Sequence, residues 1–326
     1  MTIAKLILFL ASTIKASSIF IFGSTGEILT EKSGHLNMGI PGIMFLGALG
    51  GLFGERLYID TLAANAPLND FLIVFIPMIF AMIFAAVAGL LFAFFTVTLK
   101  CNHNVTGLTL TTFGVGISSY FLTSKYISTD RIGDAGIQMQ SMIKVDWGDN
   151  WFGSIFLSQS LLTYISIIVA IAVAIFLSKT RIGLNLRACG ENPAAADAAG
   201  INVDKYRYLA TIIGAAIAGL GGLAFELDVL KGFFNSHDAV DAFGWLCLSL
   251  VIFSIWKPSI AIGASFLFGG LQQISDHLVL NSVQTQIVLL LPYAVTIVVL
   301  VITSIFNKKN SQPPAGLGIT YFREDR

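Results

Sequence analysis

The chain has 326 residues, of which 55% are hydrophobic and only 12% are charged. Soluble globular proteins carry about 25% charged residues to solvate their surface, so this composition excludes a soluble enzyme and a disordered chain. The 19 basic and 19 acidic residues leave no cationic excess to attract phosphate, which excludes a nucleic-acid binder.

Nine apolar stretches follow one another along the chain. A membrane-spanning helix needs about 20 mostly apolar residues. The pattern therefore predicts an all-α, polytopic membrane helix bundle of about 8–10 transmembrane helices, some of them broken or re-entrant. The stretches cover roughly residues 5–26, 37–54, 71–99, 104–123, 156–178, 206–230, 242–256, 258–278 and 284–306.

The stretches differ in strength. Residues 71–99, 156–178 and 284–306 run almost without a charge and are the strongest candidates for spanning helices. The weakest are short or rich in glycine and threonine, and are candidates for broken or re-entrant segments: 37–54, 104–123 and 242–256.

The first stretch is predicted to be a retained helix rather than a signal peptide. Its apolar run continues past Lys15 to Phe22, and no small-residue cleavage site follows a short core.

Basic residues predict the orientation. Almost half of the lysines and arginines lie in segment 178–210 and after residue 306. Since cytoplasmic loops are enriched in Lys and Arg, we expect a transmembrane domain over 1–306 with a cytoplasmic loop at 179–205, and a cytoplasmic tail over 307–326. Alternation then places loops 55–70, 124–155 and 279–283 outside. The side of the N-terminus stays open.

Small residues recur at helical spacing. Glycines follow the GxxxG pattern in the second stretch, and small residues repeat every four positions in the sixth: Gly47/Gly51, Gly50/Gly54, Ala215/Gly219 and Ala218/Gly222. This spacing lets helix backbones approach closely. It favours packing within the chain, with a dimer seam as the alternative.

Motifs for catalysis and cofactor binding are missing. There is no GxxxxGK[ST] phosphate loop and no HExxH, and the four histidines are dispersed. The three cysteines lie far apart without CxxC spacing. The sequence therefore predicts no catalytic residue, no cofactor and no metal site, and any ATP must be hydrolysed by another chain.

The polar loop after the fifth stretch contains a predicted short helix over 193–199, nearly all alanine. Asn192 suits its N-cap, Pro193 its first position and Gly200 its C-cap. A helix of about seven residues is not stable alone. We therefore expect this smooth helix to sit in a groove on another protein, with a solvated surface helix as the alternative.

This loop resembles the ATPase-coupling loop of ABC importer permeases in the branched-chain amino acid, ribose and nucleoside group, T-x-x-G-x-x-L-R-A-x-G-E-N-P-x-A-A-x-x-x-G-I. The residues that match this pattern include Thr180, Gly183, Leu186 and Ile201. The other matching residues are those to which the resemblance assigns ATPase coupling: Arg187, Ala188, Gly190, Glu191, Asn192, Pro193, Ala195, Ala196 and Gly200.

Three further segments resemble the nucleoside-type branch of that group. They are Gly26 to Met44, which follows G-E-x-x-x-E-R-S-G-V-L-N-L-G-x-E-G-x-M, then Asn104 to Leu108, and the tail Pro314 to Glu324. Pro41 departs from the pattern, which has glutamate there, and favours a helix break.

The resemblance implies a permease half in the bacterial plasma membrane. Its implied partners are a second permease subunit, identical or a sister, ABC ATPase subunits, and an extracytoplasmic lipoprotein or periplasmic binding protein.

A path for a neutral solute needs hydrogen-bonding side chains and aromatic faces in an apolar wall. The candidates are Asn37, Asn104, Thr106, Thr109, Phe243 and Trp245. The three glycines and one proline in 34–42 predict a helix break around Asn37. Ordinary packing, bonding of threonines to their own helix, or capping by Asn37 is the alternative.

The resemblance to the nucleoside-type branch implies nucleosides as the cargo. A neutral solute is also favoured because few charges lie deep in the stretches: Lys15, Glu226 and Asp228. A simple sugar, riboflavin or a branched-chain amino acid is the alternative for the same machinery. A stand-alone secondary carrier is the alternative of another class; it would need inverted repeats or buried carboxylates.

Overall fold

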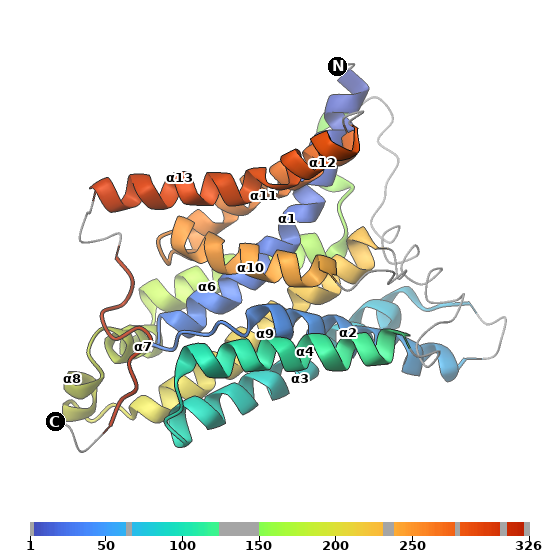
Figure 1. Cartoon of the computed structure of the whole chain (residues 1–326). Helices are drawn as coiled ribbons and strands as arrows, with labels where there is room; N and C mark the ends of the chain where they lie inside the picture. The colour runs from blue at the N-terminus through green and yellow to red at the C-terminus, as the bar shows by residue number, and fades with distance from the viewer. Residues whose placement is uncertain are drawn as a thin grey trace.

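The computed structural model describes residues 3–62, 67–123, 150–230, 238–277, 281–306 and 312–322, and all regular structure among them is helical. Figure 1 shows the elements. They are α1 (Ile3–Glu31), α2 (Ile40–Asp60), α3 (Asp70–Ala93), η1 (Phe94–Thr98), α4 (His103–Thr123), η2 (Gly153–Leu157), α6 (Leu161–Lys179), α7 (Arg181–Glu191), α8 (Pro193–Ala198), α9 (Val203–Ala224), η3 (Phe225–Val229), α10 (Asp238–Phe253), α11 (Pro258–His277), α12 (Ser282–Leu289) and α13 (Leu291–Phe306). Those labelled η are single π-helical turns.

The predicted membrane helix bundle is confirmed. Within the described residues, 6 helices are long and apolar enough to cross a membrane. Each of the nine apolar stretches contains helix. Of the three expected to be weak, α4 is continuous over 104–123, α2 begins only at Ile40 within 37–54, and α10 ends at Phe253 within 242–256.

The stretch 284–306, predicted as one strong span, overlaps a candidate span over Ser282–Val299, and this span is interrupted at Leu290, which separates α12 from α13. Pro292 lies in the first turn of α13. Because proline has no backbone N–H and clashes with the preceding turn, it starts a new helix here rather than continuing α12.

Helix α9 packs against α1, α2 and α3 in the middle of the bundle. Its small residues make this possible: the backbone of Gly219 touches Gly47 of α2, and Gly222 lies on the carbonyl of Met44. On the other side of α2, Gly50 and Gly54 pack on phenylalanines of α3. The predicted packing of small residues within the chain is confirmed.

The two ends of the bundle differ. Figure 1 shows α7, α8 and the C-terminal segment at one end, and the start of α1 and the ends of α2 and α11 away from it. This arrangement fits the predicted alternation of loops. Most of loop 124–155 and much of the tail 307–326 lie outside the described residues, and the side each end occupies stays a prediction.

Thiol labelling tests that orientation. Cys101, in the partly exposed turn after η1, lies at the α7 end, whereas Cys189 is buried. Burial raises the pKa of Cys189 to about 11, so it stays a protonated, unreactive thiol at neutral pH. We expect an impermeant maleimide to modify Cys101 in inside-out vesicles but not in intact cells, and to spare Cys189 in both, measured by peptide mass spectrometry. Labelling of Cys101 in intact cells would invert the topology.

Candidate functional site

The loop 179–205 folds as two short helices, α7 and α8. The Thr180 hydroxyl accepts the Gly183 N–H at 3.0 Å to begin α7, and the Asn192 side-chain oxygen Oδ1 accepts the Ala195 N–H at 3.0 Å to begin α8. Pro193 occupies the first position of α8, and Gly200 has a φ of 82° just after the helix. The predicted N-cap Asn192 and first residue Pro193 are confirmed. The helix ends at Ala198 instead of residue 199, its C-cap is Ala199, and Gly200 is the residue after that cap.

The residues assigned to ATPase coupling fall into three groups. Glu191, Asn192, Ala195 and Gly200 are exposed and form, with Ala198 and Ala199, a smooth surface of small side chains. Arg187, Ala188 and Pro193 are half-buried. Gly190 and Ala196 are buried and hold the helices against the bundle, so they have a packing role in this chain.

Gly190 is the point where α7 meets the turn after α1. A Cβ on Gly190 would come within 3.0 Å of the Gly34 nitrogen, so only glycine allows this approach. Gly34 itself has a φ of 88°, a left-handed conformation that favours glycine. The predicted break near Asn37 is therefore real: residues 32–39 form a turn that separates α1 from α2.

Residues 312–322, here called the C-terminal strap, cover this junction. The Gly316 N–H donates to the Gly190 carbonyl at 2.8 Å, and the Gly318 N–H donates to the Gly34 carbonyl at 3.0 Å. The Ala315 N–H donates to the Glu191 carboxylate at 3.2 Å. The C-terminal strap thus connects α7 to the turn between α1 and α2.

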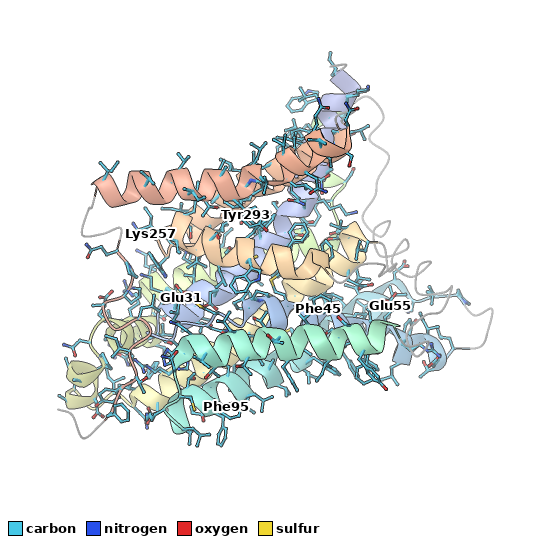
Figure 2. The ribbon with its side chains drawn as sticks, viewed as in Figure 1. Glu31, Phe45, Glu55, Phe95, Lys257 and Tyr293 are labelled. Atoms are coloured by element: carbon cyan, nitrogen blue, oxygen red, sulfur yellow. The ribbon has the colours of Figure 1, made fainter. Side chains whose placement is uncertain are left out.

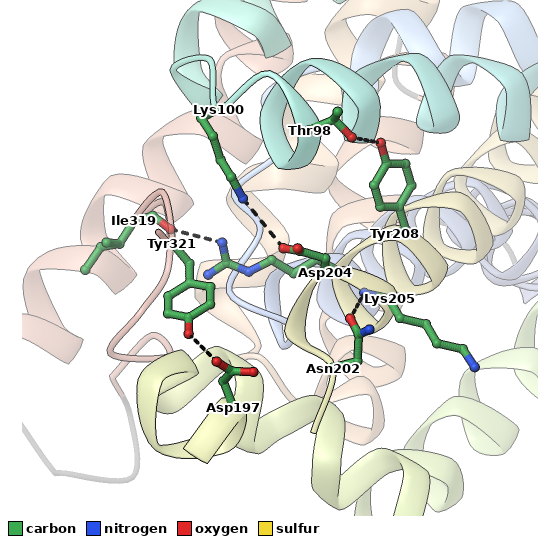
Figure 3. A network of polar contacts seen from close by, with 10 residues as sticks. Thr98, Lys100, Asp197, Asn202, Asp204, Lys205, Tyr208, Ile319 and Tyr321 are labelled. Carbon is green, nitrogen blue, oxygen red and sulfur yellow. Dashed lines mark hydrogen bonds and ion pairs between the residues drawn. The ribbon is translucent and has the colours of Figure 1, made fainter. Parts of the chain in front are cut away.

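Figure 3 shows how the strap continues over α8 and α9. The Tyr321 hydroxyl donates to the Asp197 carboxylate at 2.9 Å, and the Arg207 guanidinium donates to the Ile319 carbonyl at 3.2 Å. Sequence reasoning noted the resemblance of this tail to a family pattern but gave it no role. Its Pro-Ala-Gly-Leu-Gly run was the available signal, because closely spaced small residues permit backbone pairing.

A second connection joins α9 to the turn before α4. The Lys100 ammonium and the Asp204 carboxylate lie 3.6 Å apart, and the hydroxyls of Thr98 and Tyr208 form a hydrogen bond (Figure 3). These two contacts connect the first turns of α9 to the segment between η1 and α4.

The predicted path residue Asn37 is fully buried within the chain. Its Oδ1 accepts the Gly39 N–H at 2.9 Å, an Asx-turn just before α2, and its own N–H donates to Glu27 at 3.2 Å. The amide nitrogen Nδ2 has no hydrogen-bond partner among the described residues. The capping geometry is present, while the path role stays a prediction.

The path candidates on α4 lie on its surface. Thr106 and Thr109 each donate to their own helix backbone at 2.8 Å, as the alternative interpretation expected. Both also line a groove of about 570 Å³ between α3, η1 and α4, whose walls include Phe92, Phe95 and Phe113. Asn104 is exposed in the first turn of α4, outside this lining.

The aromatic candidates lie elsewhere. Phe243 is buried, with its ring centroid 5.4 Å from that of Phe20 and 4.9 Å from that of Phe225. Trp245 is half-buried on the same helix. The groove beside α4 includes neither of them nor Asn37, so the structure does not bring the predicted path residues together in it.

The expectation of few buried carboxyl groups is wrong. Because α1 continues to Glu31 and α2 to Asp60, Glu27, Glu31 and Glu55 are buried together with Glu226 and Asp228. Glu31 accepts the Trp256 Nε1–H, and Asp228 accepts the Ser160 hydroxyl at 2.6 Å. Glu55 and Glu226 have no hydrogen-bond partner among the described residues.

Two substitutions separate the capping role of Asn37 from a path role. Asn37→Ser keeps a side-chain oxygen for the Gly39 N–H but removes the amide nitrogen, whereas Asn37→Ala removes both. We expect Asn37→Ala to lose about 1 kcal/mol of stability, as caps do, and Asn37→Ser to keep its melting temperature but lose transport. Normal transport by the serine variant would leave Asn37 as a cap alone.

The geometry defines a multi-pass helical membrane protein with two short helices, α7 and α8, packed at one end of the bundle. A family model described as "Branched-chain amino acid transport system / permease component" matches residues 9–300. The chain belongs to this family of ABC transporter permeases, which in general work with ATPase and substrate-binding partners.

Several relatives match over most of the chain. It is 30% identical over 94% of its length, and 94% of the relative's, to the nucleoside ABC transporter permease protein NupC of Lactococcus lactis. It is 28% identical over 97% of its length, and 96% of the relative's, to the guanosine ABC transporter permease protein NupQ of Bacillus subtilis. It is 30% identical over 80% of its length, and 74% of the relative's, to the putative glucose ABC transporter permease protein TsgC13 of Haloferax volcanii.

Proposed function

We propose that this chain is the permease subunit of an ATP-driven importer and forms the translocation path for nucleosides. The observation that carries the proposal is the exposed surface of α8. This helix presents alanines and Gly200 to solvent, while Gly190 and the strap fix it to the transmembrane helices.

The mechanism follows from those connections. An ATPase that holds α8 in a groove would move it when its own subunits close on ATP. The Tyr321–Asp197 bond and the Lys100–Asp204 pair would transmit the movement to α9 and the α3–α4 turn. Hydrolysis takes place on the ATPase subunits, and this chain contributes the path.

The remaining partners follow from the same proposal. A second permease subunit, identical or a sister, completes the pore in the bacterial plasma membrane, and an extracytoplasmic binding protein delivers the solute. Asn104 and Thr109 are exposed and Thr106 is half-buried on the single chain, which supports a role at a surface that faces the second subunit or the solute.

Nucleosides are proposed as the cargo because two relatives that match almost the full chain are named for nucleoside or guanosine transport. Phenylalanine rings beside threonine hydroxyls in the α4 groove suit a base joined to a sugar. The relative named for glucose makes a simple sugar the second candidate. Because carboxyl groups are buried in this chain, a stand-alone secondary carrier is the alternative that the uptake experiment below must distinguish.

Uptake by the reconstituted transporter tests the proposal. The chain is assembled in vesicles with the ATPase and binding protein encoded beside it, and uptake of labelled guanosine is measured with competing solutes. We expect uptake that requires ATP and is blocked by other nucleosides but not by glucose or leucine. Competition by glucose would support the sugar alternative, and uptake without the ATPase would overturn the importer assignment.

A further inference from the structure

A cavity of about 490 Å³ opens between α6 and α11 at the end of the bundle that carries α7. Its walls are apolar, formed by residues such as Ile171 and Ile175 of α6 and Ile262 of α11, with Trp256 at its base. Neither the groove beside α4 nor α8 contributes a lining residue to this cavity. Lys257, one of its lining residues, is labelled in Figure 2.

Three cations line the cavity: Lys32 after α1, Arg187 of α7 and Lys257 before α11. No acidic residue is among its lining residues. The two ion pairs present among the described residues, Arg56–Asp60 and Lys100–Asp204, involve none of the three. The Nε of Arg187 is buried and has no hydrogen-bond partner among the described residues.

The electrostatics show how closely these cations are gathered. Burial lowers the pKa of Lys32, and Arg187 and Lys257 lower it further by repulsion, while Glu191 and Glu31 act in the opposite direction. Neither acid lies within ion-pair distance of the three cations among the described residues: Glu191 accepts the Ala315 N–H, and Glu31 accepts the Trp256 Nε1–H. A cluster of like charges beside an apolar wall is costly unless an anion neutralises it.

The surroundings indicate an anion that also has a hydrocarbon part. Beyond the cavity the outward faces of the two helices are apolar and exposed, at Ile168, Ile171 and Ile175 on α6 and at Ile260 and Leu267 on α11. These side chains continue the cavity wall along the bundle, where a membrane surrounds it. Basic pockets between transmembrane helices on the cytoplasmic side bind the head groups of anionic lipids.

We propose that this cavity binds an anionic phospholipid, with its phosphate among Lys32, Arg187 and Lys257 and its acyl chains along α6 and α11. The start of α11 at Pro258 adds the positive end of a helix dipole to the phosphate site. Because Arg187 belongs to α7, the lipid would join the coupling helices to the membrane surface. The proposal does not depend on the identity of the cargo.

Tryptophan quenching tests the proposal on the full chain. Trp256 lines the cavity, so a bound lipid with brominated acyl chains quenches its fluorescence on contact. The chain is reconstituted in phosphatidylcholine vesicles that contain brominated phosphatidylglycerol or, at the same mole fraction, brominated phosphatidylcholine. The Trp256→Phe variant identifies the signal of Trp256. We expect clearly stronger quenching of this signal by phosphatidylglycerol.

Charge variants identify the site. A basic residue near an anionic membrane surface contributes about 1 kcal/mol, so Lys257→Gln should weaken phosphatidylglycerol binding about fivefold and Lys32→Gln with Lys257→Gln about 30-fold. Lys257→Arg should keep it. Lys205→Gln, which removes an exposed cation outside the cavity, is the matched control. Size-exclusion chromatography establishes that each variant is folded.

Other occupants give other results. Equal quenching by the two lipids, or selective quenching that the double variant retains, would overturn the proposal. Displacement of brominated phosphatidylglycerol by millimolar inorganic phosphate would assign the cations to a soluble anion instead. Loss of the selective quenching when the ATPase subunits are bound would assign them to an acidic side chain of that partner.

Discussion

Ala195→Trp should abolish coupled transport while leaving the permease folded. The Ala195 side chain is exposed on α8, so the indole is accommodated in the isolated chain. In the complex it would enter a groove shaped for a methyl group. Overpacking costs about 1–3 kcal/mol, so binding of the ATPase should weaken by about 5- to 150-fold. The measurements are uptake, substrate-stimulated ATP hydrolysis and co-purification of the ATPase.

Two variants make this result specific. Leu57→Trp places the same side chain at an exposed apolar position near the opposite end of the bundle and should keep coupling. Ala195→Ser changes little volume and should also keep it. If Ala195→Trp retains normal ATPase stimulation, α8 is not the docking element, whatever cargo the transporter carries.

Gly222→Ala should prevent the chain from folding to a stable bundle. Gly222 lies against the carbonyl of Met44, and an added Cβ would also come within 3.1 Å of the Ala48 nitrogen. Because these atoms belong to the backbone of α2, the added Cβ fits only if α2 and α9 move apart. We expect a loss at or above the upper end of the about 1–3 kcal/mol that overpacking costs, seen as aggregation on size-exclusion chromatography in mild detergent.

Gly263→Ala is the matched control, because it makes the same change in α11 at a position with no atom within 4 Å. Alanine is the better helix former by about 1 kcal/mol, so this variant should keep or raise the melting temperature. A stable Gly222→Ala chain would show that the contact between α2 and α9 is looser than the structure has it.

Local interactions made much of the architecture predictable. The apolar stretches, the Asn192–Pro193–Gly200 cap signals and the glycine-rich break near Asn37 each depend on neighbours a few residues away along the chain. The structure has helices at all nine stretches and the cap of α8 at Asn192. The exception was 284–306, where hydrophobicity suggested one helix and the single Pro292 divided it.

Distant contacts decided the site. Gly190 contacts Gly34 and Gly316, which lie more than a hundred residues away along the chain. The local sequence at these three positions does not indicate that they are in contact. Phe243 became a core residue because Phe20 and Phe225 surround it. The gathering of Lys32, Arg187 and Lys257 around one cavity likewise appears only when their helices are assembled.

Helix ends account for the missed carboxyl groups. Glu27, Glu31 and Glu55 lie just beyond the ends of the predicted apolar stretches, and so were not counted among the charges deep in them. The sequence by itself determined that the chain is a helical membrane bundle with a capped short helix after the fifth stretch, because hydrophobicity and capping act locally. Only the tertiary structure decided which polar residues are buried, since burial depends on which helices pack around them and over what length.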